Sequence, residues 1–195
     1  MATNWGITTD LATDSDVNFT RAMSGVLPAT ASMILDSVSI YCGIQHSGQV
    51  RVAVYQGGSS SDPAGASLLE DLGLTSGSVI NTWQVLTSST TPALASGGRI
   101  WIVVKCNDSA FGIVYSSNSA DAGDFRSDVG RWNDDTISSA EDTAYPATWP
   151  ANSGSFANYW YSFYLTYSIS GAGGRVTKNT RAFPLGEAIG MPFRF

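Results

Sequence analysis

The amino-acid sequence predicts an all-β protein: a single antiparallel β-sandwich, jelly-roll or immunoglobulin-like, with an extended C-terminal arm. Three observations predict this fold. Apolar and polar residues alternate over several short segments, which is the period of a half-buried strand. Gly, Pro, Ser and Asn separate these segments about every 8–12 residues, as is typical of sandwiches. Charged residues make up only 13% of the chain, well below the usual share of about a quarter.

The chain of 195 residues is long enough for one domain with extensions. We expect an N-terminal arm or irregular first strand over 1–19, the sandwich domain over 20–170 and the C-terminal arm over 171–195. The start of the chain lacks the basic and apolar regions of a secretory signal. We therefore expect a protein that is made and used without export.

The strands follow from the alternation. Val38, Ile40 and Cys42 face one way, while Ser39 and Tyr41 face the other. The same reasoning predicts strands at 33–44, 50–55, 83–86, 99–106, 111–115 and 159–169, with a hairpin turn at 45–49 and another turn at 92–98. The segment 67–74 fits either a short strand or one helical turn. The last strand carries aromatic residues on both faces near its start, so we expect a central strand covered on both sides.

A long polar stretch, 116–156, separates the last two of these strands. A structureless loop of this length is unusual in a compact domain, so we expect a short strand near 125–132 and an ordered loop around it. Four aromatic residues, Trp132, Tyr145, Trp149 and Phe156, fall in this stretch. They suit either of two roles: anchors that hold the loop to the sandwich, or a sugar-stacking platform with Trp132, Tyr145 and Trp149 as glycan contacts.

The same stretch is rich in acids: Asp121, Asp124, Asp128, Asp134, Asp135, Glu141 and Asp142. Carboxylate oxygens are the ligands that Ca²⁺ takes, often where it holds loops together. No D-x-D-x-D-G loop is present, so a solvated acidic loop is the other interpretation of 121–142. Beyond this calcium alternative, we expect no cofactor.

Catalytic motifs are missing from the sequence. Its one histidine, His46, stands in a predicted turn, and no nucleophile elbow, HExxH helix motif or P-loop accompanies it. The two cysteines, Cys42 and Cys106, lie in apolar strand-like runs, where buried free thiols or a disulfide between neighbouring strands are both open. We expect no enzyme and no tetrahedral zinc site.

Charge and hydropathy exclude two classes of partner. The net charge is −6, and the first 170 residues hold only six of the ten basic residues, scattered along the chain. A nucleic-acid surface needs clustered Lys and Arg. No apolar run approaches the roughly 20 residues that span a bilayer. We therefore expect neither nucleic acid nor membrane as a partner.

The C-terminal arm differs from the rest of the chain. It begins with the Gly-rich sequence 171–174 and then has four basic residues against one acid, a net charge of +3, whereas the preceding 170 residues hold six basic and fifteen acidic ones, a net charge of −9. Disordered segments are usually poor in aromatics because nothing buries them. We therefore expect the arm to lie on protein, through Arg175, Lys178, Arg181, Phe183, Leu185, Ile189, Met191, Phe193, Arg194 and Phe195.

The stretch over residues 35–115 resembles a β-sandwich module of tailed-bacteriophage virion proteins that also occurs in some secreted bacterial proteins. The matching residues are 50–55 (VRVAVY), 63–65 (PAG), Trp83, 94–98 (LASGG) and Trp101. These are packing motifs, so the resemblance implies the sandwich and fixes no ligand. The C-terminal arm is similar in style to the ends of capsid decoration (cement) proteins, which bind the outside of a capsid and often form trimers.

Together these observations predict a non-enzymatic virion structural protein, located in the virion and assembled in the host cytoplasm. Its expected partners are its own copies, in a homotrimer, and the major capsid protein or another virion protein. The alternative is a carbohydrate-binding module, or a tail or fibre component that binds host glycans.

Overall fold

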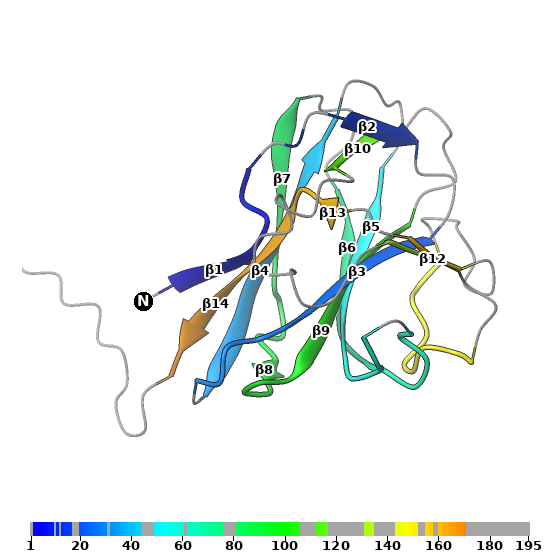
Figure 1. Ribbon diagram of the computed structural model, residues 1–195. Helices are drawn as coiled ribbons and strands as arrows, with labels where there is room; N and C mark the ends of the chain where they lie inside the picture. Colours follow the sequence, from blue (N-terminus) through cyan, green and yellow to red (C-terminus); the bar gives the residue numbers. More distant parts are fainter. Residues whose placement is uncertain are drawn as a thin grey trace, which may run out of the picture.

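The computed structural model describes residues 2–9, 11, 13–16, 20–30, 32–43, 49–60, 62–75, 81–105, 112–116, 131–134, 143–151, 155–157 and 160–170. These residues form strands, turns and loops and contain no helix. Two antiparallel sheets pack face to face as a β-sandwich, which confirms the predicted all-β sandwich (Figure 1). The C-terminal arm, 171–195, lies outside the described residues.

We refer to the two sheets as sheet A and sheet B. Sheet A contains β1 (Ala2–Gly6), β2 (Thr13–Asp16), β4 (Met33–Cys42), β7 (Thr82–Thr87), β8 (Ala93–Leu94), β10 (Gly112–Ser116), β13 (Trp160–Tyr161) and β14 (Phe163–Ile169). Sheet B has the order β12 (Ser155–Ala157), β11 (Arg131–Asp134), β3 (Thr20–Val26), β9 (Arg99–Lys105), β5 (Arg51–Gln56) and β6 (Ser67–Leu74). In sheet A, β4 is central because β14 pairs with one edge of it and β7 and β8 with the other.

The core fills the space between the two sheets. From sheet A it takes the inward residues of β4 and β14, such as Val38, Ile40 and Leu165. From sheet B it takes Val52 and Ile102, the inward residues of β5 and β9. All of these side chains are fully buried, which fits the period of two that the sequence showed. Each contributes roughly 1.5–3 kcal/mol of hydrophobic stabilisation relative to exposure.

Several strands lie where the sequence predicted them. The segment Ser67–Leu74 is a strand, β6, and not a helical turn. The turn at 92–98 also contains the two-residue strand β8. Ala2–Gly6 pairs with β14 along its whole length, so this part of 1–19 is a strand. The predicted hairpin turn falls mostly on residues 44–48, outside the described part of the chain.

Other strands differ from the prediction. β3 (Thr20–Val26) had no apolar alternation that would reveal it, because polar and small residues such as Arg21, Ser24 and Gly25 stand at its buried positions. Of the strand expected near 125–132, residues 131 and 132 belong to β11 (Arg131–Asp134), and 125–130 lie outside the described residues. The final strand is interrupted at Ser162, whose buried hydroxyl accepts a hydrogen bond from the Leu11 backbone N–H at 3.1 Å.

β14 was expected to be covered on both sides. It is central in the sheet, between β1 and β4. Its inward residues are buried, but Tyr164, Thr166 and Ser168 on the other face are only partly so. The outer side of β14 is therefore accessible within the part of the molecule that the structure describes.

A search of the described residues finds no helix with the length and hydropathy needed to cross a membrane.

Candidate functional site

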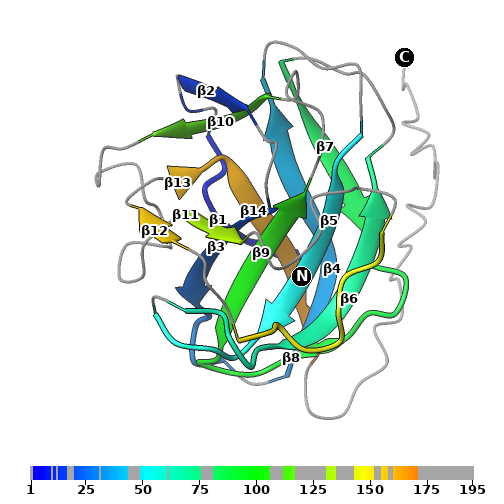
Figure 2. The same cartoon turned by 90° about the vertical axis from the view of Figure 1, so that its right-hand side faces the viewer.

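The outer faces of the two sheets differ in what covers them. At sheet B, residues 143–151 form a strap that runs alongside β6 and past the end of β5 (Figure 2, yellow). The strap pairs with the start of β6: Trp149 N–H donates to Ala66 O at 2.8 Å, and Leu68 N–H donates to Ala147 O at 2.9 Å. This face is therefore closed by the chain itself.

Two aromatic residues of the strap fill the outer face of sheet B. Tyr145 is 5% exposed and Trp149 is 1% exposed. Both meet Tyr55 of β5 edge to face, with ring centroids 6.2 Å and 5.1 Å away, a preferred geometry for aromatic pairs. The small side chains Ala22 and Ala53 belong to the same cluster, which leaves space on the sheet for these large rings.

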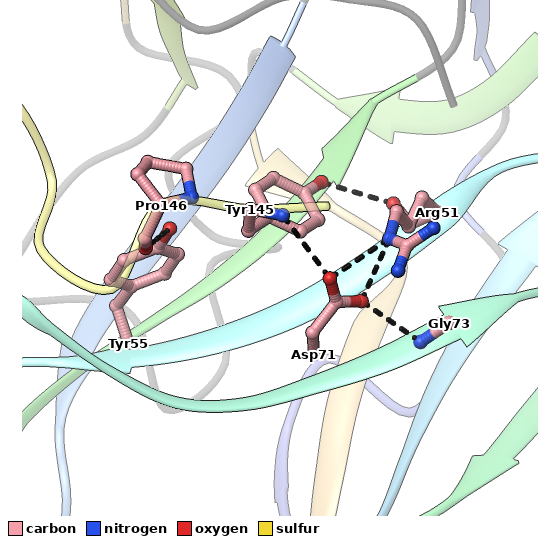
Figure 3. Close-up of polar contacts among 6 residues, drawn as sticks. All are labelled: Arg51, Tyr55, Asp71, Gly73, Tyr145 and Pro146. Carbon is pink, nitrogen blue, oxygen red and sulfur yellow. Dashed lines mark hydrogen bonds and ion pairs between the residues drawn. The ribbon is translucent and has the colours of Figure 1, made fainter. Parts of the chain in front are cut away.

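A polar network fixes the strap at Asp71 of β6 (Figure 3). The Arg51 Nε–H lies 2.9 Å from both Asp71 oxygens. The same carboxylate accepts hydrogen bonds from the backbone N–H groups of Tyr145, at 3.1 Å, and Gly73, at 3.1 Å. Gly73 has a φ of 83°, a left-handed conformation that favours glycine. A single carboxylate thus joins two strands to the strap.

The hydroxyl groups of the two tyrosines also bond to backbone. Tyr145 donates to Arg51 O at 3.0 Å, and Tyr55 donates to Pro146 O at 2.6 Å. Burial, followed by the negative charge of Asp71, raises the pKa of both phenols well above the usual value. The Lys105 ammonium lies 4.6 Å from the centre of the Tyr145 ring, in cation–π geometry. Both phenols therefore stay neutral and act as donors at physiological pH.

At Tyr145 and Trp149, these contacts decide between the two proposed roles, loop anchor and sugar platform. Tyr145 and Trp149 are buried anchors and do not offer ring faces to a sugar. Trp132 belongs to β11 and pairs with Phe156 of β12 and Ala22 of β3, but its side chain lies outside the described part of the structure. The glycan role of Trp132 stays a prediction.

Sheet A presents a different outer face, with partly exposed aromatic rings. Trp83 of β7 meets Tyr41 of β4 at 5.3 Å and Tyr164 of β14 at 4.9 Å between ring centroids, both edge to face. Val85, next to Trp83 on the same face, is 60% exposed, the largest value among the exposed large hydrophobic residues described. We call Tyr41, Trp83, Val85 and Tyr164 the aromatic patch.

The strand register explains how the aromatic patch forms. Tyr41 pairs directly with Trp83, whereas Tyr164 and Val85 pair with Ser39 from opposite sides. Because Ser39 is small, the rings of Trp83 and Tyr164 meet above it, and Ser39 is only 1% exposed as a result. The patch thus combines three strands that are far apart in the sequence.

Polar groups border the aromatic patch along β14 and β4. Thr166 donates to Asn4 Oδ1 at 2.9 Å, and Ser168 donates to Asp36 Oδ2 at 2.6 Å. The strands of sheet A hold three acids, Asp14, Asp16 and Asp36, and no Lys or Arg. The strands of sheet B hold five basic residues, Arg21, Arg51, Arg99, Lys105 and Arg131, against three acids. Positive charge in the strands is therefore confined to sheet B.

The cysteines, the histidine and the acidic loop that the sequence singled out are described only in part. Cys42 is a buried free thiol, and burial raises its pKa to about 12. Its proposed partner, Cys106, and His46 lie outside the described residues. Of the acids suggested for Ca²⁺, only the backbone of Asp134 is described, and the residues that the structure does describe contain no group of three or more possible metal ligands.

The ten arm residues proposed as partner contacts, Arg175 to Phe195, also lie outside the described part of the chain. The aromatic patch was not predicted as a site. Its signal was present, since Tyr41 and Tyr164 fall on the polar faces of alternating strands, where a large ring is unexpected. The strand register that brings them next to Trp83 cannot be deduced from any one segment of the sequence.

No family model matches this chain, and no curated protein is significantly similar to it.

Proposed function

We propose that the chain is a non-enzymatic virion structural protein: a capsid decoration protein that forms a homotrimer and binds the major capsid protein shell through its C-terminal arm. The observation that carries the proposal is the composition of 171–195, which holds six large apolar residues and a net charge of +3 directly after an acidic sandwich. The trimer and the capsid partner follow from the resemblance of this arm to those of decoration proteins.

The sandwich suits the role of a rigid head. Its core is closed, and the strap is held over sheet B by hydrogen bonds, an ion pair and buried rings. The strand that precedes the arm, β14, is paired on both sides and anchored at its end by the Ser170 N–H, which donates to Ser32 O at 2.7 Å. Tension on the arm would therefore be carried into the middle of sheet A.

The arm has enough apolar surface to hold subunits together. Burying six large apolar side chains contributes on the order of 10 kcal/mol before the cost of ordering the segment. Its basic groups can pair with acidic groups on a partner. The net charge of −9 on residues 1–170 also keeps free subunits soluble and apart before assembly.

The test compares the full chain with a 1–170 truncation by sedimentation. The described core lies entirely within residues 2–170, so the truncation is expected to fold with the same circular dichroism spectrum. The full chain should sediment as a trimer and pellet with capsid shells, and the truncation should be a monomer that stays in solution. A truncation that trimerises and pellets like the full chain would contradict the proposal.

Glycan binding is the second candidate function, and the aromatic patch is the observation that favours it. Aromatic rings can stack on sugars, and the neighbouring hydroxyl groups of Thr166 and Ser168 could bind sugar hydroxyls. A glycan array probed with the wild type, Trp83→Ala and Trp132→Ala tests this role. It requires a glycan signal from the wild type that at least one substitution removes.

A further inference from the structure

We infer that the aromatic patch on sheet A is the docking site for the C-terminal arm, 171–195, of a neighbouring copy of the chain. The inference rests on the proposed assembly and says where on the subunit the arm binds. The aromatic patch is an apolar surface that no described segment of the same chain covers. The opposite outer face already has its cover, the strap.

The geometry of the rings favours a polypeptide over a sugar. The Tyr41 and Trp83 planes are inclined by 76°, and those of Trp83 and Tyr164 by 60°. A sugar platform needs ring faces that lie open side by side, whereas in this patch the edge of one ring lies against the face of its neighbour. The result is an uneven apolar surface, which suits branched and aromatic side chains such as Leu185, Ile189 and Phe193.

Charge complementarity favours the arm as the occupant. The arm has four basic residues and one acid. The strands of sheet A have three acids and no basic residue, whereas sheet B has an excess of two positive charges, five basic residues against three acids. A net-positive segment therefore meets opposite charge on sheet A, where Asp36 stands beside Ser168.

The length and starting point of the arm allow it to reach a neighbour. It follows Ser170 at the end of β14, a strand of the same sheet that carries the aromatic patch. Twenty-five residues span at most about 80–90 Å when extended, several times the length of β14. In a closed ring of identical subunits, each copy would give one arm and receive one, so that every patch is covered.

The test uses full-length chains throughout. Val85→Arg changes the patch at its most exposed apolar residue, so folding should be unaffected, and it places a positive charge opposite a positive arm. Val26→Arg is the matched control, because Val26 is an exposed valine on sheet B, 39% exposed. Phe193→Ser with Phe195→Ser changes the arm and leaves the patch intact. Should Val85→Arg misfold, Thr87→Arg replaces it as the patch variant, because Thr87 is an exposed residue beside Val85 on the same face of β7.

Sedimentation should show wild type and Val26→Arg as trimers with equal dissociation constants. Val85→Arg and the arm variant should each dissociate at a concentration at least tenfold higher. Mixing the two should produce a heterodimer at concentrations where neither variant associates alone, because an intact arm from one chain meets an intact patch on the other. This recovery distinguishes arm exchange between copies from docking of the arm on its own subunit.

Three results would overturn the inference. If the arm variant dissociates but both patch variants remain trimeric, the arm binds elsewhere, and the proposed function stands. If the wild type is itself monomeric at all concentrations, the proposed assembly fails as well. If Val85→Arg abolishes binding on a glycan array while the trimer persists, the aromatic patch is a sugar site.

Discussion

Glu70 is a buried carboxylate, 6% exposed, that connects the two sheets. It extends from β6 of sheet B to the loop after β7 of sheet A. There it accepts hydrogen bonds from the Ser88 hydroxyl, the Ser89 N–H at 2.7 Å and the Thr90 N–H at 3.1 Å. The loop contains Thr91 with a φ of 47°, an unusual conformation for a β-branched residue. Glu70 therefore stabilises a strained turn.

Glu70→Gln is expected to lower the free energy of unfolding at pH 7 and to make it depend less on pH. Burial raises the pKa of Glu70, but the hydrogen bonds from Ser88, Ser89 and Thr90 offset it, and the pKa is lower than its ordinary value of 4.5. The folded state thus favours the ionised form, and this contribution is present above about pH 4.5 and is lost as the pH falls through the folded-state pKa. At pH 7 the substitution should cost about 1–3 kcal/mol.

Urea unfolding at pH 7 and at successively lower pH measures this effect. The difference in unfolding free energy between wild type and Glu70→Gln should shrink as the pH falls. Asp36→Asn serves as the control, because the Asp36 side chain accepts a hydrogen bond from the exposed-face residue Ser168 and does not hold a loop. A difference that is constant with pH would show that the charge of Glu70 contributes nothing.

At the scale of the element, the strap over 143–151 depends on a small number of contacts. Its hydrogen bonds to β6 lie at the edge of sheet B, and its Tyr145 and Trp149 rings pack in the apolar cluster on the outer face. Trp149 is 1% exposed and packs on Tyr55. Without this ring, the outer face of β5 and β9 would lose much of its apolar cover.

Trp149→Ala should therefore destabilise the protein by about 3–5 kcal/mol, the usual cost of removing a buried tryptophan. The strap should also become the first site of limited proteolysis, identified by mass spectrometry of the early fragments. Val85→Ala, at an exposed position, should change stability by less than about 0.5 kcal/mol. Equal stabilities for Trp149→Ala and Val85→Ala would contradict the anchoring role.

Sequence reasoning located β4, β5 and β9 near their predicted ranges because these strands are rich in β-branched and aromatic residues. In β4 the alternation also reflects one buried and one partly exposed face, whereas β5 and β9 are buried on both faces. β3 is as deeply buried as β9 but escaped prediction because it has few large β-branched or aromatic residues, and small and polar ones, Ser24 and Gly25 among them, stand at its buried positions.

The aromatic patch was beyond sequence reasoning for a different reason. Alternation placed Tyr41 and Tyr164 on the outer faces of their strands, as the structure has them. Only the pairing of β4 with both β7 and β14 brings them to Trp83. Register between distant strands is set by long-range packing. The burial of Tyr145 and Trp149 depends on the same kind of contact, with β5 and β6.

At the scale of the whole molecule, the two sheets and the arm differ in charge, and the residues outside the strands and the arm hold nine acids and one basic residue. The strands of sheet A hold three acids and no basic residue, those of sheet B hold five basic residues and three acids, and the arm has a net charge of +3. An arm that docks on sheet A brings opposite charges together near an apolar surface. Apolar burial then supplies most of the affinity, while charge contributes orientation and rate.

Salt should separate these two contributions. The Debye length falls from about 10 Å at 0.1 M salt to about 3 Å at 1 M, so the attraction between arm and sheet A weakens as salt rises. The trimer should dissociate more easily at 1 M than at 0.1 M NaCl, by roughly tenfold or less in dissociation constant, and should not be lost, because apolar burial is not screened. Sedimentation at fixed protein concentration measures the change. Arg175→Gln and Lys178→Gln should make the dissociation constant depend less on salt. If association instead strengthens steadily with salt, charge opposes the contact, and the arm cannot be held by the acidic sheet.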